Sequence, residues 1–397
     1  MQRLQFDQGI FIVGAKRTPF CKYGGSLREL TASYIFATAA KGAIQSAEVD
    51  PSIIDHTFVG NVNYLSQCDG GKTPRYCGVY SGVPIDRPAL GVNRACGSGL
   101  QAVINGALEI LTGLARVSLT GGTEQMTSLP HLVRNVRFGA TLGGSYQFED
   151  HITTQFVDSR SGLTLQKVAE ELAKNYNVTR EDADKYASES RLKWKAAQTS
   201  NVFAEELVSV TATMRRKEIT VSEDEVTDVD SSLRGLEALQ PTLIDGSVVT
   251  AGNSAAPADG AASLLLTDEE TVTRHQLRPL ARVAGWACVG GDPESGLGAV
   301  TAVERLLEVT GVKEVHLFEI SDMFASQAVV TSRQLNIDPE QLNVSGGALT
   351  LGHPVAASGA RIAVHMVHEL RRRNLKTGVV ASNCGGGQGI ALLLENM

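Results

Sequence analysis

The sequence has little of what marks membrane, nucleic-acid-binding or secreted proteins. No apolar run reaches the roughly 18 residues that a membrane span requires, so we expect no span. The formal net charge of −7 argues against a nucleic-acid partner, although it allows a local basic pocket for an anion. Residues 1–9 are polar and lead into a strand-like segment, unlike a secretory signal. The last residues match no peroxisomal or ER-retention address.

Cysteine is also scarce. Six cysteines, at positions 21, 68, 77, 96, 288 and 384, are spread over the chain without paired spacing. This spacing predicts neither a zinc site nor a disulfide scaffold, so we expect no metal and a reducing compartment. We therefore expect the protein in the cytoplasm or the mitochondrial matrix, and not secreted.

Length and glycine content indicate the fold class. With 397 residues, 43% of them hydrophobic, the chain is long enough for two or more packed domains. Its 40 glycines gather at the ends of predicted strands. The recurring order of strand, Gly-rich turn, helix and strand predicts an α/β fold.

The stretch 89–102 carries the strongest single signal. An extended apolar run ends at Cys96, a small flexible turn follows, and a helix with one apolar face begins. Backbone N–H groups at a helix start are unpaired and the dipole is positive there. We therefore expect a lowered thiol pKa and a thiolate nucleophile, with Gly97 and Gly99 leaving room for a substrate. The stretch alone fits equally well a buried structural cysteine.

A second stretch near the C-terminus has the same predicted layout. An extended segment at 343–348 is followed by the turn Gly352-His353-Pro354 and by a helix from Ser358 to Arg373. A strand from Thr377 to Ser382 and the triplet Gly385-Gly386-Gly387 come next. Two copies of one layout, about half a chain apart, predict an internal duplication.

The middle of the chain differs in character. It contains predicted polar helices at 167–175 and 180–198 and a charged stretch at 215–230, which together indicate an inserted loop domain. We therefore divide the chain into three parts. They are an N-terminal half (1–124 plus 247–273), the inserted loop domain (125–246) and a C-terminal half (274–397).

Several Gly-flanked motifs together resemble the thiolase superfamily. In chain order they are Ala15-Lys-Arg-Thr-Pro19, Asn93-Arg-Ala-Cys96-Gly-Ser-Gly99, Gly121-Gly-Thr-Glu-Gln-Met126, Arg134-Asn-Val-Arg137, Val249-Thr-Ala-Gly-Asn253, Gly346-Gly-Ala-Leu-Thr-Leu-Gly352-His353-Pro354 and Cys384-Gly-Gly-Gly-Gln-Gly389. By pattern the chain is most similar to degradative 3-ketoacyl-CoA thiolases and acetyl-CoA acetyltransferases. The resemblance implies the thiolase fold: two duplicated halves packed as a layered αβαβα core, with an inserted loop domain.

The resemblance also implies catalytic roles. Cys96 would be the nucleophile that carries the acyl group, and His353 would take its proton. Cys384 would protonate the departing acetyl-CoA and then activate the incoming CoA thiol. Ser321, through a water, and the backbone N–H of Gly385 would stabilise the substrate oxyanions.

CoA binding is implied less specifically. Ser254 stands where the resemblance places a serine near the pantetheine arm, and Arg215 is a candidate by charge alone, with a solvated surface run as the alternative. CoA would be a co-substrate, with no permanently bound cofactor. The family's usual assembly implies a homodimer or homotetramer.

Four positions depart from the family pattern. Asn383 stands at the usual place of the second cysteine, so that Cys384 comes one residue late. In a strand such a slip turns a side chain to the other face. Ser321 replaces an asparagine that positions a water, Ser254 is a shifted serine, and Ala356 replaces a glycine beside His353.

These motifs predict a CoA-dependent acyltransferase that cleaves 3-ketoacyl-CoA to acetyl-CoA and a shortened acyl-CoA through a Cys96 acyl-enzyme, with the reverse Claisen condensation as its other direction. The alternative is a degenerate thiolase-like protein that binds or slowly hydrolyses acyl-CoA. A ketosynthase acting on an acyl-carrier protein shares the fold. It needs a Cys-His-His or Cys-His-Asn set that is not evident here.

Overall fold

The strands of the core form one path through both halves of the chain. The computed structural model describes residues 8–66, 70–227 and 229–397, so that Cys68 lies outside the described residues. The strand order is β12–β13–β14–β11–β1–β10–β5–β3–β4, with β2 beside β10. One half-sheet contains β1 (Ile10–Arg17), β2 (Cys21–Lys22), β3 (His56–Gly60), β4 (Ala89–Val92), β5 (Val117–Gln125) and β10 (Ala258–Asp268); the other contains β11 (Ala281–Val289), β12 (Leu317–Ile320), β13 (Thr377–Cys384) and β14 (Gln388–Asn396). Two residue pairs, Phe11 with Arg282 and Ile12 with Ala281, join β1 to β11.

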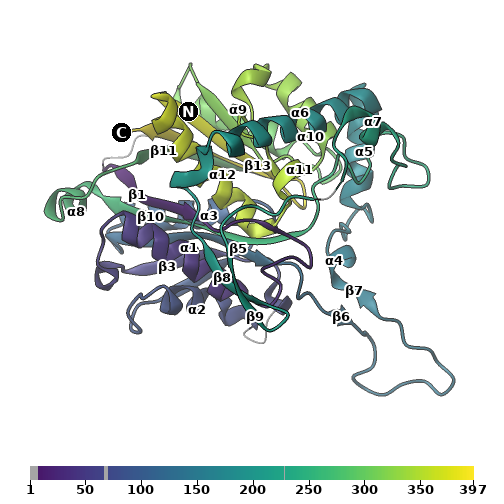
Figure 1. Cartoon of the computed structure of the whole chain (residues 1–397), viewed down its shortest axis with the longest axis horizontal. Helices are drawn as coiled ribbons and strands as arrows, with labels where there is room; N and C mark the ends of the chain where they lie inside the picture. Colours follow the sequence, from purple (N-terminus) through teal and green to yellow (C-terminus); the bar gives the residue numbers. More distant parts are fainter. Residues whose placement is uncertain (1–7, 67–69, 228) are drawn as a thin grey trace.

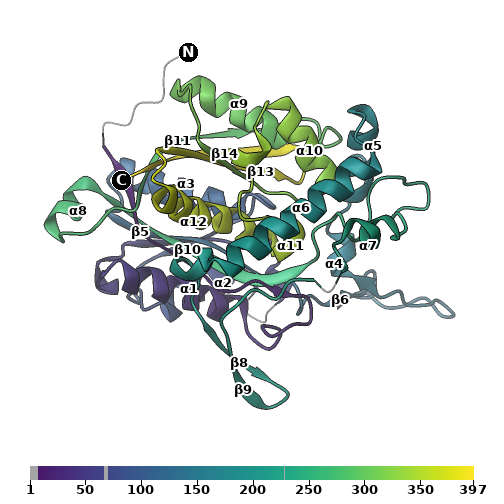
Figure 2. The ribbon, with the colours of Figure 1, turned by 45° about the horizontal axis from the view of Figure 1, so that its top comes forward.

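Helices lie between and outside the two half-sheets. The helices α3 (Ser98–Leu111) and α12 (Val355–Arg373) lie in the middle, where they contact each other and strands of both halves. On one outer face lie α1 (Ala32–Ser46) and α2 (Thr73–Tyr80); on the other lies α9 (Gly298–Thr310), with α10 (Ala325–Gln334) beside it (Figures 1 and 2). This is the layered αβαβα arrangement that the resemblance implied.

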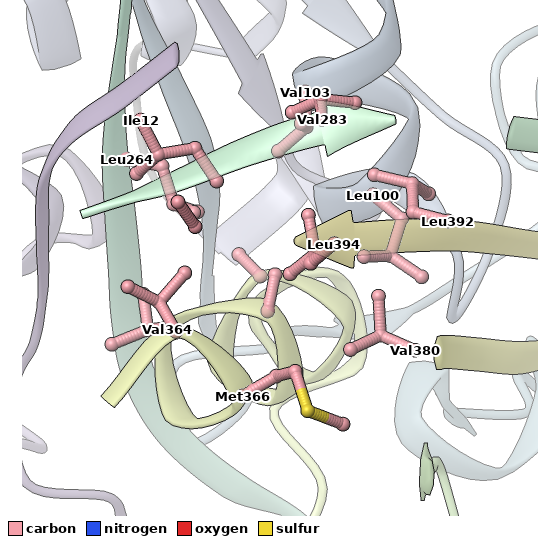
Figure 3. Packing of buried hydrophobic residues seen from close by; sticks show 14 of the residues in the cluster. Ile12, Leu100, Val103, Leu264, Val283, Val364, Met366, Val380, Leu392 and Leu394 are labelled. Carbon is pink, nitrogen blue, oxygen red and sulfur yellow. The ribbon is translucent and has the colours of Figure 1, made fainter. Parts of the chain in front are cut away.

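The largest apolar cluster lies around the two central helices. Figure 3 shows residues of α3 and α12 packed between strands of both half-sheets. The labelled side chains are buried: Leu100 and Val103 of α3, Val364 and Met366 of α12, Ile12 and Leu264 of one half-sheet, and Val283, Val380, Leu392 and Leu394 of the other. Because this cluster is shared, burial of apolar surface holds the two halves together.

Close packing in the middle layer depends on glycine. A Cβ atom at Gly99 in α3 would lie 2.6 Å from the Ala360 nitrogen and 2.7 Å from the Ala356 oxygen, both in α12. A Cβ atom at Gly122 in β5 would lie 2.2 Å from the same Ala356 oxygen. The missing side chains therefore let α3 and β5 approach the start of α12.

The structure confirms most elements predicted around the two Gly-rich turns. The strand at Ala89–Val92 and the helix after Cys96 are present. The strand expected at 343–348 is wrong, because that segment forms turns and then the short helix α11 (Ala348–Leu351). The strand β5 continues through Gly121 and Gly122 to Gln125.

The stretch 125–246 contains the predicted polar helices and a hairpin that the sequence did not predict. Its elements are β6 (His131–Leu132), β7 (Glu149–Asp150), α4 (His151–Thr154), α5 (Leu165–Asn175), α6 (Arg180–Thr199), β8 (Val210–Met214), β9 (Lys217–Val221) and α7 (Leu233–Glu237). The helices α5 and α6 pack against α10, and the segment between β6 and β7 extends away from the body (Figure 1). The short helix α8 (Glu269–Arg274) follows β10. The three-part division of the chain stays a prediction.

No helix within the described ranges is both long and apolar enough to cross a bilayer.

Replacing Gly99 with Ala tests the close packing of α3 on α12. The new methyl group would overlap the backbone of Ala356 and Ala360. Overpacking of this kind lowers the free energy of unfolding by about 1–3 kcal/mol. The matched control is Gly71→Ala, because a Cβ atom there has no neighbour within 4 Å. Denaturant unfolding of both variants measures the effect, and equal stability of the two variants would contradict this account of the middle layer.

Candidate active site

Cys96 lies in a tight turn between β4 and α3. Its predecessor Ala95 has a left-handed backbone with φ of 47°. Side chains of the turn stabilise this conformation: Asn93 Oδ1 accepts from the Ala95 N–H at 3.0 Å, and Ser98 Oγ accepts from the Arg94 N–H at 2.9 Å. The turn therefore places Cys96 directly before the first turn of α3, as the sequence predicted.

His353 faces Cys96 from the turn before α12. Its Nε2 atom lies 3.2 Å from Cys96 Sγ, and its Nδ1 atom lies 2.8 Å from Ser358 Oγ. The Ser358 hydroxyl donates to the Pro354 carbonyl at 3.3 Å, so its oxygen is free to accept from Nδ1–H. This tautomer leaves Nε2 as the acceptor for the Cys96 thiol, which is the arrangement that a general base requires.

Burial controls the protonation of this pair. Burial, and to a smaller extent the Glu124 carboxylate, raises the pKa of the Cys96 thiol to about 12. Burial and Arg361 lower the pKa of His353 to about 4. The lowered thiol pKa expected from the helix start is therefore wrong, because loss of hydration outweighs the helix dipole. At neutral pH the resting pair is an uncharged thiol hydrogen-bonded to an uncharged imidazole.

Glu124 positions the start of α12, and the sequence did not predict this role. Its carboxylate is buried at the end of β5, and burial raises its pKa to about 7. It accepts from Asn61 Nδ2 at 2.9 Å, from the Asn63 N–H at 3.0 Å and from the Ala356 N–H at 3.1 Å. Through Ala356 it fixes the first turn of α12, and with it the turn that carries His353. Ser358, which orients the imidazole, was likewise missed as a functional residue.

Two cavities meet at Cys96. Residues of α5 and of the C-terminal half line the first cavity, the latter including Ser321, Met323, Phe324, Asn383, Cys384 and Gly385. The second is largely apolar and includes Val62, Phe156, Val157, Leu165 and Val355. Cys96 therefore borders two cavities, one with the glycine turn 385–387 on its wall and one with side chains such as Val62 and Phe156 on its wall.

Cys384 lies against the turn of Cys96 despite the one-residue slip. A Cβ atom on Gly97 would lie 2.5 Å from Cys384 Sγ, and the thiol packs among core residues. Burial, with Cys96 nearby, raises its pKa strongly. Asn383 lines the same cavity, and its Oδ1 atom accepts from the Ala299 N–H of α9. The structure thus brings Cys384 to the site, while its chemical role stays a prediction.

Of the other predicted site residues, some line the two cavities and some do not. Ser321 is buried at the end of β12 and lines the first cavity; Gly385 lines both cavities. The Ser254 hydroxyl is buried next to Phe324, and no residue that the structure describes forms a hydrogen bond with it. Arg215 is exposed at the tip of the β8–β9 hairpin and lines neither cavity. Its proposed contact with CoA therefore has no geometric support.

Across the part of the chain that the structure describes, no group of three or more His, Cys, Asp or Glu side chains is arranged to hold a metal ion.

The pH dependence of Cys96 alkylation tests the neutral resting pair. With a thiol pKa near 12 and a His353 pKa near 4, the thiolate fraction grows about tenfold per pH unit above neutrality. Iodoacetamide should therefore label Cys96 about tenfold faster for each unit from about pH 7 to about pH 9. Peptide mass spectrometry separates this label from that on the exposed Cys288. A rate that is constant over this range would instead indicate a thiolate–imidazolium pair.

Comparisons with known proteins match nearly the whole chain to one family. The family model described as "Thiolase, N-terminal domain" matches residues 10–270, and "Thiolase, C-terminal domain" matches residues 277–396. The chain is 40% identical over 392 residues to the mitochondrial 3-ketoacyl-CoA thiolase of Homo sapiens, covering 98% of each. It is 34% identical over 394 residues to an acetyl-CoA acetyltransferase of Rhizobium meliloti, covering 98% of this chain and 100% of the relative.

Solved structures extend the likeness to three dimensions. The crystal structure of human mitochondrial 3-ketoacyl-CoA thiolase in complex with CoA superposes with a TM-score of 0.94 at 40% identity, covering 98% of each chain. The Bacillus anthracis acetyl-CoA acetyltransferase superposes with a TM-score of 0.95 at 32% identity, covering 99% of this chain and 100% of that one. With both family models matched along nearly its whole length, this chain belongs to the thiolase family.

Proposed function

We propose that the protein is a CoA-dependent acyltransferase that cleaves 3-ketoacyl-CoA to acetyl-CoA and a shortened acyl-CoA, and that also runs the reverse Claisen condensation. The contact of 3.2 Å between Cys96 Sγ and His353 Nε2 in a buried site carries this proposal. The names of the relatives support it, as does the CoA bound in one similar structure. They give no support to a degenerate acyl-CoA-binding protein.

The first half of the reaction forms the acyl-enzyme. His353 Nε2 takes the proton of Cys96 as the sulfur attacks the ketone carbon, and the carbonyl electron pair moves to oxygen. The tetrahedral species then restores its carbonyl and breaks the bond between the α- and β-carbons. The released electron pair forms the enolate of acetyl-CoA, whose α-carbon takes a proton from Cys384. The acyl group stays on Cys96, His353 is an imidazolium, and Cys384 is a thiolate.

The second half transfers the acyl group to CoA. The Cys384 thiolate takes the proton of the incoming CoA thiol, and the new CoA thiolate attacks the acyl carbon. Cys96 leaves as a thiolate and recovers its proton from the imidazolium of His353. Each residue thereby returns to its starting state. Cys384 is assigned this role because, besides Cys96, it is the side chain on the wall of the first cavity that can exchange a proton.

The apolar cavity beside Cys96 suits the acyl chain. Val62, Phe156, Leu165 and Val355 line it, and burial of a hydrocarbon chain there is favourable. We assign the first cavity, with Ser321 and Gly385 on its wall, to the thioester end of the substrate, and Ser254 to the pantetheine arm.

A homodimer or homotetramer in the mitochondrial matrix or the cytoplasm completes the proposal. The strand β4 forms an edge of the sheet path, with Leu90 48% exposed, and Phe138 and Leu142 are fully exposed between β6 and β7. Such surfaces favour contacts between subunits. The names of several relatives include the word mitochondrial, and bacterial relatives match as well.

Steady-state thiolysis tests the proposed roles. With acetoacetyl-CoA and a longer 3-ketoacyl-CoA as substrates, Cys96→Ala should lower kcat on the order of 10⁴-fold or more, because the acyl carrier is lost. Cys384→Ala should lower kcat by about 10²–10⁴-fold, the usual effect of losing a general acid and base. Cys288→Ala, which removes an exposed cysteine, is the control and should match the wild type.

Two results would contradict the proposal at different points. A wild-type enzyme that cleaves neither substrate would overturn the thiolase activity itself. A Cys384→Ala variant with wild-type kcat would leave the activity standing and remove Cys384 from the mechanism.

A further inference from the structure

The two ends of the Asn383 side-chain amide have different environments. Its Oδ1 atom accepts a hydrogen bond of 2.8 Å from the Ala299 N–H, in the first turn of α9. The residue before this helix, Leu297, provides no side-chain cap. The Asn383 oxygen therefore takes the role of the cap, which satisfies one unpaired N–H of α9.

The other end of the amide is unpaired. Asn383 Nδ2 is buried and has no hydrogen-bond partner among the described residues. Exchanging the nitrogen and oxygen positions would set N–H groups against the Ala299 N–H, so the bond to Ala299 determines the orientation. A buried amide donor without a partner is unfavourable unless something else binds it. Its place at the wall of the cavity that contains Cys96 points to a bound molecule.

An amide in this position donates hydrogen bonds but exchanges no proton near neutral pH. It is therefore suited to an oxygen that becomes negatively charged, and not to acid or base work. The bond to Ala299 fixes it before the substrate binds, which is what makes such donors effective in catalysis. The cavity that it shares with Ser321 is the one assigned above to the thioester end of the substrate.

We propose that Asn383 Nδ2 donates a hydrogen bond to the thioester oxygen of the substrate as the carbon–carbon bond breaks, an inference that rests on the proposed thiolysis. When the bond between the α- and β-carbons breaks, its electron pair forms the enolate double bond, and the carbonyl pair moves to the thioester oxygen. Asn383 stabilises that oxygen and keeps its own proton. The proton for the α-carbon comes from Cys384.

The variant Asn383→Asp separates this role from capping. The aspartate keeps an oxygen for the Ala299 N–H but replaces the donor nitrogen with a second oxygen. We expect the thermal midpoint to stay at the wild-type value, while kcat for acetoacetyl-CoA thiolysis falls by about 10²–10³-fold. Its remaining activity, relative to wild type, should rise toward acidic pH as the carboxyl gains a proton that it can donate. Asn105→Asp in α3, outside both cavities, is the matched control.

Each other outcome overturns the inference. A stable Asn383→Asp variant with a kcat close to the wild-type value would show that the residue only caps α9. If the aspartate variant loses stability, Asn383→Ala provides a second test, because it removes both the cap and the donor. The inference then requires that Asn383→Ala lose at least as much stability and also lose activity. An Asn383→Ala variant that is less stable but fully active excludes the donor role. Wild-type enzyme without thiolysis would overturn the proposed function, and this inference with it.

Discussion

The contact between Cys96 Sγ and His353 Nε2 joins two turns that are 257 positions apart in the chain. The rest of the architecture depends on this contact or provides it. The helices that follow the two turns, α3 and α12, are the middle layer of the core, and Gly99 lets them approach closely. Glu124 connects the end of β5 to the first turn of α12. Cys96 and His353 therefore meet only when both halves of the chain are packed.

Burial sets the chemistry of the pair. It raises the pKa of Cys96 and lowers that of His353, so both groups rest uncharged and charge develops only with the substrate bound. Because Cys96 and His353 are buried, the proposed mechanism requires donors already present in the site to stabilise that charge. Backbone N–H groups of the Gly385 turn and the fixed amide of Asn383 line the same cavity. Fixed donors of this kind act more strongly in a low dielectric than in water.

The sequence predicted the features that depend on local pattern. Cys96 and His353 each stand in a Gly-flanked turn before an amphipathic helix, and the helix at Arg180 follows its polar periodicity. Features that depend on distant contacts were missed: the roles of Glu124 and Ser358, and the thiol pKa, which burial reverses. The extended segment expected at 343–348 is instead a set of turns, in which Asn343 and Gly346 have left-handed backbones and Asn343 Oδ1 accepts from the Ile320 N–H. Arg215 was chosen by charge alone, and the fold places it at an exposed hairpin tip.

The spacing of the motif could not predict which of the two side chains, Asn383 or Cys384, lies beside Cys96. A one-residue slip at the end of a strand can turn a side chain to either face. The structure sends Asn383 toward α9 and Cys384 toward the turn of Cys96. This arrangement keeps a thiol near the nucleophile while it adds an amide to the cavity wall. Under the proposed mechanism, Cys384 would transfer the proton and Asn383 would donate the hydrogen bond.

The most direct test of the Cys96–His353 pair is peptide mass spectrometry of enzyme quenched in acid shortly after mixing with acetoacetyl-CoA. The wild type should carry an acetyl group on the peptide that contains Cys96. His353→Ala, which keeps the backbone bond from position 353 to Ala256, should carry almost none. An acetyl group on a different residue, or equal acetylation of Cys96 in the two proteins, would contradict the assignment of nucleophile and base.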